Sequence, residues 1–239
     1  MMILQATAAQ GGIPTIWILM LALMVLSYIV QASLQSKFTR YAKVPLPNGM
    51  TGKDVAEKML RDHGINDVRI TCIPGRLTDH YNPTDQTVNL SRDVYYGNNV
   101  SAAAVAAHEC GHAVQHATAY AWLRMRSALV PVVSFSNNVV MWVLLAGVLL
   151  VETVPALLLF GIFLFALTTL FSFITLPVEI DASRRAVAWL DRADIVNAET
   201  RPMAASALRS AAYTYVVAAL TSLATLLYYI MIFMGRSRR

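Results

Sequence analysis

Residues 155–181 read PALLLFGIFLFALTTLFSFITLPVEID, an apolar run that ends in two acids. No Asp, Glu, Lys or Arg occurs anywhere in residues 153–178. A helix of about 20 apolar residues crosses the hydrocarbon core of a bilayer, which is about 30 Å thick. The stretch therefore predicts a membrane-spanning helix that carries Glu179 and Asp181 at the point where it leaves the bilayer.

Three further stretches lack charged residues, namely 1–36, 127–151 and 210–235. Of all residues, 56% are hydrophobic and 14% are charged, whereas an average soluble domain has about 45–50% and about 25%. We therefore expect a mainly α integral membrane protein with four transmembrane helices, at 13–34, 129–151, 155–177 and 213–234. Because no Lys or Arg precedes the first span, we expect a retained anchor and not a cleaved signal peptide.

The segments 35–128 and 178–212 remain outside the predicted spans. Residues 68–73 and 87–91 show the composition and alternation of short strands, and residues 79–86 are expected to form a polar loop between them. The strand at 87–91 is predicted either as an exposed edge that receives an extended peptide or as an ordinary buried strand. The smaller segment, 178–212, is expected to be helical and to pack on the larger one.

Two soluble helices are predicted within 35–128. Thr51 and Asp54 resemble a capping box at the start of the first helix, and Gly64 is expected to end it. The second helix follows from an alanine-rich stretch, since alanine is the strongest helix former. Ser101 is its expected N-cap, and it should run to about Tyr120.

The second helix carries the pair His108 and His112, four residues apart. Residues at this spacing differ by about 40° around a helix, so both imidazoles point to the same side and suit one zinc ion. Glu109 lies beside the first histidine, where it is expected to act as general base on a water activated by the metal. A chance match is the alternative, but the strong helix prediction and Gly111 favour a metal site.

Catalytic zinc usually takes three protein ligands. Glu179 is the predicted third ligand, because a membrane hairpin would return the chain to the histidine pair. Asp181 is expected to orient a ligand histidine instead, although the choice between these two acids stays open. Pairing of both acids with Arg184 and Arg185 is the alternative interpretation.

Three other residues are candidates for positioning a ligand or stabilising a transition state. His116 lies about 12 Å along the helix from His108, which is too far for a shared metal ion. His80 and Tyr81 could donate a hydrogen bond to an oxyanion. A polar surface loop explains His80 and Tyr81 equally well.

Three stretches resemble a known family: HECGHAVQH at 108–116, LTDHYNP at 77–83 and LPVEIDASRRA at 176–186. The chain resembles the YugP-like membrane zinc metallopeptidases over nearly its whole length. It more distantly resembles the HtpX-type and CAAX prenyl proteases. The resemblance implies a small zincin-like α+β metalloprotease domain with a gluzincin-like site, in which Glu179 matches the glutamate ligand. The spacing Glu-x-Asp departs from the Glu-x-x-x-Asp spacing of HtpX-type chains.

These features predict a membrane-bound, zinc-dependent endopeptidase that cleaves membrane or membrane-associated proteins. A non-catalytic zinc-binding assembly or sensor protein of the membrane is the alternative function. Expected partners are a peptide or protein substrate, the lipid bilayer, and a partner protein or a second copy of the chain. No nucleic acid is expected, because the basic residues flank the spans and do not form a patch.

The distribution of positive charge predicts the orientation. Of the 19 Lys and Arg residues, 16 lie in 35–128 and 178–212. Basic residues mark the cytoplasmic side of membrane proteins, so we expect an active site on the cytoplasmic face of a bacterial inner membrane. The tail residues Arg236, Arg238 and Arg239 argue against this orientation.

Overall fold

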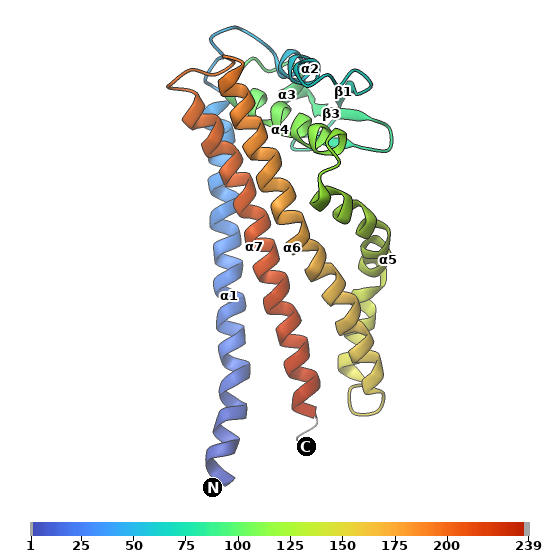
Figure 1. Cartoon of the computed structure of the whole chain (residues 1–239). Helices are drawn as coiled ribbons and strands as arrows, with labels where there is room; N and C mark the ends of the chain where they lie inside the picture. Colours follow the sequence, from blue (N-terminus) through green and yellow to red (C-terminus); the bar gives the residue numbers. More distant parts are fainter. Residues whose placement is uncertain (1, 237–239) are drawn as a thin grey trace. The chain divides into compact units, whose positions relative to one another are not determined.

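The computed structural model describes residues 2–236, and side chains only for residues 16–235 (Figure 1). Of the three tail arginines, Arg238 and Arg239 lie outside the described residues, and the side chain of Arg236 is not described. The elements are α1 (Met2–Tyr41), α2 (Gly52–Asp62), β1 (Arg69–Ile73), β2 (His80–Asn82), β3 (Thr87–Ser91), α3 (Arg92–Tyr95), α4 (Val100–Ala117), α5 (Ala121–Leu149), α6 (Pro155–Arg192) and α7 (Arg201–Arg236).

The four long helices confirm the predicted fold class. Within the described residues, four helical segments are long and apolar enough to cross a membrane: Ile16–Tyr41, Ala121–Leu149, Pro155–Arg192 and Arg201–Gly235. A small three-stranded sheet and shorter helices make up the α+β part. The side chains at 13–15, which begin the predicted first span, are outside the described part.

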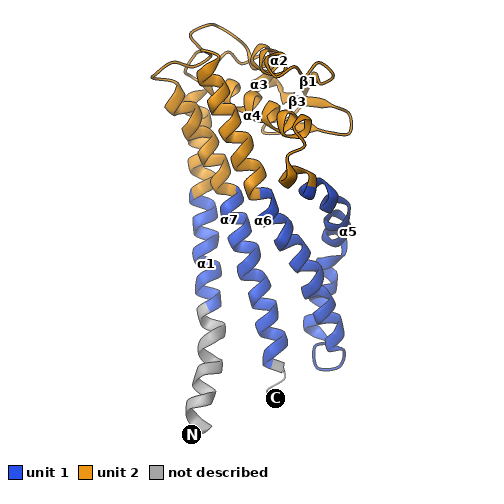
Figure 2. Ribbon diagram, in the orientation of Figure 1, with its two compact units in different colours: residues 1–29, 125–175, 215–239 blue, residues 30–124, 176–214 orange. Residues whose placement is uncertain are grey.

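The chain divides into two compact units, coloured separately in Figure 2. Unit 1 consists of residues 1–29, 125–175 and 215–239, and unit 2 consists of residues 30–124 and 176–214. The chain thus leaves unit 2 after Arg124, runs through α5 and most of α6, and enters unit 2 again at Leu176. Residues far apart in the sequence are thereby joined within one unit.

Unit 1 is held by close helix packing and by hydrogen bonds between helices. A Cβ on Gly147 of α5 would lie 2.7 Å from Cα of Leu158 in α6, so the two backbones approach closely. Thr168 Oγ1 donates a hydrogen bond to Asn137 Oδ1 at 3.1 Å. Small residues and polar side chains of this kind are typical of helix contacts in membranes, where the hydrophobic effect does not drive association.

In unit 2 the strand order is β1-β3-β2, with β1 parallel and β2 antiparallel to β3. All five residues of β3 are buried. The prediction of an exposed edge strand at 87–91 is therefore wrong, and the buried-strand alternative is right. The two edge strands are β1 and β2, and β2 lies within residues predicted to be a loop. With only three residues, β2 is too short to show an alternating pattern, and its strand geometry depends on pairing with β3.

The α2 helix begins and ends where its sequence signals predict. Thr51 Oγ1 accepts a hydrogen bond from Asp54 N at 3.2 Å, and Asp54 Oδ2 accepts one from Thr51 N at 2.9 Å. Gly64 follows the helix with a φ of +70°, which glycine adopts without steric cost. The buried face of α2, which includes Val55 and Met59, packs against α4.

The N-cap of α4 is Asn99, so the expectation of Ser101 as N-cap is wrong. Asn99 Oδ1 accepts a hydrogen bond from Ala102 N at 2.9 Å. A β-bridge pairs Asn99 with Pro45, and Val100 N donates to Val44 O at 3.0 Å. Asn and Ser are both good N-cap residues. The pairing keeps the backbone extended up to Asn99, so the helix begins directly after Asn99 and Ser101 lies inside it.

The α6 helix continues through Pro177 and far beyond the predicted span. Its 38 residues give a length of about 57 Å, whereas about 20 residues cross the hydrocarbon core. Its C-terminal end, from Leu176 onward, belongs to unit 2. This extension carries Glu179 out of the bilayer and into the α+β part.

Gly111 allows the α6 extension to lie directly on α4. A Cβ at this position would lie 2.8 Å from the carbonyl oxygen of Ala182 and 3.2 Å from its Cα. Both contacts are with backbone atoms, which cannot move without shifting a helix. Glycine is therefore required for the α4–α6 contact.

We expect Gly111→Ala to destabilise the protein by about 1–3 kcal/mol, because overpacking a close contact forces the backbone apart. The midpoint of thermal unfolding in detergent measures the effect. Gly235→Ala is the matched control, since a Cβ there meets no atom within 4 Å. Equal unfolding midpoints for the two variants would contradict the packing role of Gly111.

Candidate metal centre

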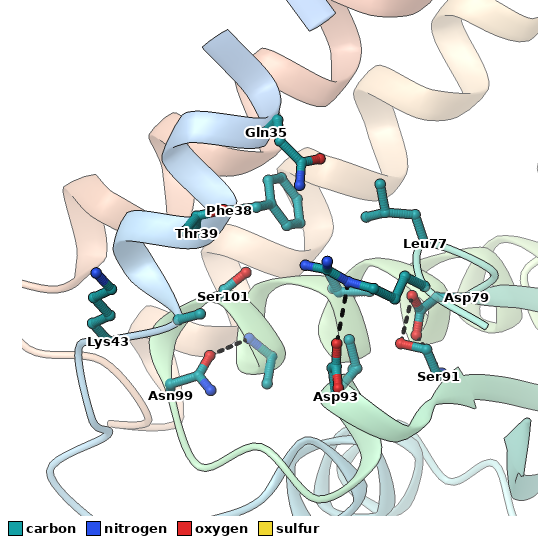
Figure 3. A pocket seen from close by; sticks show the side chains of 15 residues that line it. Gln35, Phe38, Thr39, Lys43, Leu77, Asp79, Ser91, Asp93, Asn99 and Ser101 are labelled. Carbon is teal, nitrogen blue, oxygen red and sulfur yellow. Dashed lines mark hydrogen bonds and ion pairs between the residues drawn. The ribbon is translucent and has the colours of Figure 1, made fainter. Parts of the chain in front are cut away.

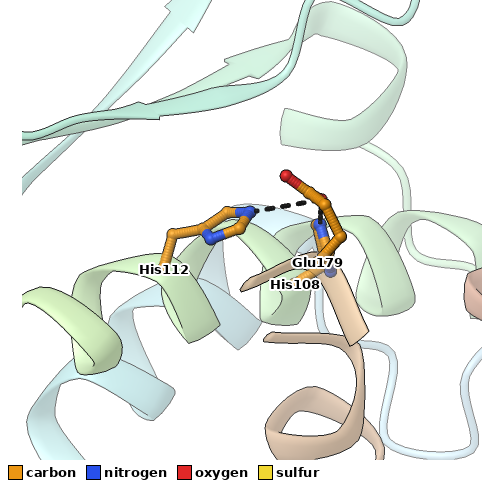
Figure 4. A group of neighbouring side chains, drawn as sticks. All are labelled: His108, His112 and Glu179. Atoms are coloured by element: carbon orange, nitrogen blue, oxygen red, sulfur yellow. Dashed lines mark hydrogen bonds and ion pairs between the residues drawn. The ribbon is translucent and has the colours of Figure 1, made fainter. Parts of the chain in front are cut away.

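Three side chains that could hold a metal ion converge in unit 2: His108 and His112 from α4, and Glu179 from α6 (Figure 4). Glu179 Oε2 lies 3.2 Å from Nε2 of His108 and 3.6 Å from Nε2 of His112. One ligand atom from each residue lies within 4.8 Å of the others. Two ring nitrogens and a carboxylate oxygen therefore face a common point.

The local sequence explains this arrangement. The i, i+4 spacing puts both imidazoles on one side of α4. Glu179 lies three residues before Ala182, about one helical turn from the residue that touches Gly111. The Gly111 contact therefore fixes the position of Glu179 along the α6 axis, opposite the two histidines.

The donor set fits zinc. Zinc binds imidazole nitrogen and carboxylate oxygen at about 2.0–2.2 Å, so ligand atoms in a tetrahedral site lie about 3.3 Å apart. The two oxygen–nitrogen distances of 3.2 and 3.6 Å fall on either side of that value. Because His112 and Glu179 are buried, a charged group at this point requires compensation.

Gln115, which the sequence analysis did not single out, sets the tautomer of His112. Its Nε2 donates one hydrogen bond to the carbonyl oxygen of Val178 and one to Asp181 Oδ2, both at 2.8 Å. Both amide hydrogens are thereby used, which fixes the amide orientation and leaves Oε1, an acceptor, 3.1 Å from Nδ1 of His112. Nδ1 must then carry the hydrogen, and the second ring nitrogen, Nε2, points at Glu179.

His108 has a similar partner, because Ser183 Oγ lies 3.2 Å from its Nδ1. Asp181 does not join the cluster. It accepts hydrogen bonds from Gln115 and from Arg185 Nε, and it therefore reaches a histidine only through Gln115. Asp181 pairs with Arg185, as the alternative interpretation expects, whereas Glu179 faces the histidines.

The charge of Glu179 controls the protonation of His112. Burial lowers the pKa of His112, but the hydrogen bond and charge of Glu179 raise it more, and Glu109 raises it further. The net shift is upward. A bound metal ion would take the place of this proton, as expected when metal and proton compete for one ring nitrogen.

Glu109 lies beside His108 and is a buried residue, at 8% exposure. In the part of the chain that the structure describes, it has no hydrogen-bond or ion-pair partner. An unpartnered carboxylate of this kind can accept a proton.

The other candidates are not members of the three-residue cluster. Tyr81 Oη lies 2.8 Å from His116 Nδ1, so β2 and the end of α4 are joined by this pair. His80 Nδ1 lies 2.8 Å from the carbonyl oxygen of Thr78, within its own turn. His80 is exposed, and its ring is engaged with this local backbone.

The family model described as "Putative neutral zinc metallopeptidase" matches residues 16–234. The chain belongs to this family. It is 41% identical over 217 residues to "Putative membrane protease YugP" of Bacillus subtilis (strain 168), covering 91% of this chain and 96% of that protein. No solved structure matches the chain significantly. The four apolar helices and this similarity support a membrane protein, and membership of the family implies zinc.

Gln115 and Ser183 were not predicted as functional residues. Gln115 stands three residues after His112 and Ser183 four after Glu179, so each is within one helical turn of a site residue. That spacing is the only sequence signal for them. It does not tell which neighbouring polar side chain turns toward a histidine.

We expect Gln115→Leu to weaken zinc binding about 10–100-fold, the usual effect of losing the partner of a ligand histidine. Leucine has a similar volume but leaves the Nδ1 hydrogen of His112 without an acceptor. Competition with a chelator of known affinity measures the change. Gln35→Leu on α1 is the control, and unchanged affinity in Gln115→Leu would refute the orienting role.

Proposed function

We propose that the protein is a membrane-bound, zinc-dependent endopeptidase of membrane or membrane-associated proteins. The observation that carries this proposal is the convergence of His108, His112 and Glu179 next to the unpartnered carboxylate of Glu109. Membership of the zinc metallopeptidase family supports it.

His108 and His112 would hold the metal through Nε2, and Glu179 through its carboxylate. Zinc bound there supplies Lewis acidity, which polarises a peptide carbonyl and lowers the pKa of water. Three protein ligands leave one position open, as in catalytic zinc sites, whereas structural sites are closed by four. Among the described residues, no fourth metal-ligating side chain joins the cluster.

Glu109 is the proposed general base. Its carboxylate oxygen would take a proton from the attacking water and pass it to the nitrogen of the leaving amine. A base must be free to receive that proton, and Glu109 has no competing donor among the described residues. Gln115 and Ser183 would keep the ring nitrogens of the two histidines turned toward the metal.

The edge strand β2 is the proposed docking site for an extended peptide. It pairs with β3 on one side only, and it contacts α4, the helix of Glu109. Strand addition would place main-chain hydrogen bonds along β2. Tyr81 on this strand, held by His116, is a proposed donor to the oxyanion. Because Glu179 follows the membrane-crossing part of α6 directly, cleavage would occur near the membrane surface.

We expect Glu109→Gln to retain zinc and abolish peptide hydrolysis, because the amide cannot act as a base. His108→Ala and Glu179→Ala should lose zinc, whereas His116→Ala should keep it. Metal analysis of purified protein and cleavage of a membrane-protein substrate mixture are the two measurements. Undiminished hydrolysis by Glu109→Gln would exclude this mechanism and favour a non-catalytic zinc assembly or sensor protein.

Loss of zinc in Asp181→Ala, with zinc retained in Glu179→Ala, would reverse the assignment of the third ligand. The contacts of Asp181 with Gln115 and Arg185 predict a smaller effect. If Asp181 proved to be the third ligand, the rest of the proposed mechanism would be unchanged.

We further propose that the active site faces the cytoplasm from a bacterial inner membrane. The proposal rests on 16 of the 19 Lys and Arg residues, which lie in 35–128 and 178–212. An even number of crossings puts both ends of the chain on the opposite side. The three arginines of the tail oppose this orientation, but they are fewer.

Cysteine labelling of intact cells should distinguish the two orientations. The exposed Cys72 is first replaced by serine. Asn98→Cys should then resist a membrane-impermeant thiol reagent, and Ser237→Cys should react. Labelling at position 98 would invert the orientation and place the substrates outside the cytoplasm.

A further inference from the structure

Unit 2 contains a cavity that none of the three cluster residues lines. It has a volume of about 310 Å³ and lies between the C-terminal end of α1, the β1–β2 turn and the first turns of α4 (Figure 3). A shallower cavity continues along α1 and shares the lining residues Gln35, Thr39 and Lys43 with it. The size is at the low end of small-molecule sites.

The hydroxyl of Ser101 is an unused hydrogen-bond donor in the lining of this cavity. Asn99 takes the N-cap role, so the hydroxyl of Ser101 is not needed to cap α4. The residue is only 7% exposed and lines the cavity, yet its hydroxyl has no partner in residues 16–235. In the same helical turn, the N–H groups of Val100 and Ala102 are bonded to Val44 O and Asn99 Oδ1.

The N-terminus of α4 carries the positive end of a helix dipole. Its 18 residues are enough for the dipole to favour an anion at its first turn. Together with the hydroxyl of Ser101, a residue that is more than nine-tenths buried, this end of the cavity is arranged for an acceptor that carries negative charge.

Lys43 adds a positive charge at the same end. Residues 44–46 run antiparallel to 98–100, with Leu46 N donating to Asn98 O at 2.9 Å and Val100 N donating to Val44 O at 3.0 Å. This pairing brings Lys43 beside the start of α4. Among the described residues, neither Lys43 nor Arg40, which lines the shallower cavity, forms an ion pair.

The two acids that line the cavity are occupied by other partners. Asp93 pairs with Arg76 at 3.5 Å. Asp79 accepts hydrogen bonds from the backbone N and Oγ of Ser91, at 2.7 and 3.1 Å. Burial raises the pKa of Asp79, so burial favours its neutral form. The free donors therefore lie at the Ser101 and Lys43 end.

The position of the cavity along α1 identifies the anion that it would meet. The predicted first span ends at residue 34, and the lining residues of α1 begin at Gln35. The polar zones add about 5–8 Å to each side of the hydrocarbon core, which is about one to one and a half turns of helix. Phosphate groups of lipids occupy that depth. The apolar side chains of Phe38 and Leu77 line the same cavity, and Leu77 is 58% exposed.

We infer that this cavity binds the phosphate of a membrane glycerophospholipid, held by Ser101, the N-terminus of α4 and Lys43. The start of an acyl chain would lie against Phe38 and Leu77. Ser101 and His108 are seven residues apart on α4, about 10 Å along the helix. The bound lipid would therefore tie the helix that carries His108 to the membrane surface. This inference does not depend on peptidase activity.

The test uses full-length protein in a neutral detergent and measures lipid binding in two ways. Native mass spectrometry counts bound phosphatidylglycerol, and thermal unfolding is followed with added phosphatidylglycerol, diacylglycerol or inorganic phosphate. We expect wild-type protein to retain phosphatidylglycerol and to be stabilised by it, but not by diacylglycerol, which lacks the phosphate. The variants Lys43→Gln and Ser101→Ala should each weaken binding several-fold, and the double variant at least 10-fold.

Lys53→Gln on α2 is the matched control, because Lys53 pairs with Glu57 at 3.2 Å and does not line the cavity. Equal lipid retention in wild type and double variant would overturn the inference, as would equal stabilisation by diacylglycerol. Stabilisation by inorganic phosphate to the same extent as by phosphatidylglycerol would also overturn it and assign the cavity to a soluble anion. Lys43→Gln changes an exposed side chain, so it keeps the test decisive if the double variant does not fold.

Discussion

The backbone contact between Gly111 of α4 and Ala182 of α6 is the constraint on which the rest of unit 2 depends. With 2.8 Å between a hypothetical Cβ and a carbonyl oxygen, only glycine permits this approach. The contact determines how far Glu179 projects over His108 and His112. It also brings Val178 and Asp181 within reach of Gln115. The candidate metal-ligand set and the groups that orient it thus follow from the absence of one methyl group.

The polar groups around this contact form a connected set. Gln115 satisfies a backbone carbonyl, a carboxylate and an imidazole at once, and Arg185 neutralises Asp181. Such networks are stabilising only when every member is paired. Glu109 is the exception, since its carboxylate has no partner among the described residues. Glu109 directly follows His108, one of the three candidate metal ligands.

The bilayer imposes the second constraint. Apolar helices are needed to cross it, and their length sets where the chain emerges. α6 is nearly twice as long as a crossing requires, so its extension serves the α+β part and belongs to unit 2. α1 contributes to the same unit from Val30 onward. Two helices of the membrane thereby become structural parts of the site and of the lipid cavity.

The sequence by itself determined the four apolar helices, the α2 boundaries, strand β3 and the histidine pair. These follow from composition and from interactions between residues a few positions apart, which any chain segment carries with it. The i, i+4 spacing of His108 and His112 needs only a helix, and the run of alanines before His108 provides one.

Only the tertiary structure decided the remaining features, because they depend on segments distant in sequence. The pairing of 44–46 with 98–100 selected Asn99 over Ser101 as N-cap. Pairing with β3 made a strand of His80–Asn82 and placed it at one edge of the sheet. Glu179 and Asp181 are chemically alike and two residues apart, so no local rule separates them. The rotation of α6 about its axis, fixed by Ala182 against Gly111, turns Glu179 toward the histidines and Asp181 toward Gln115.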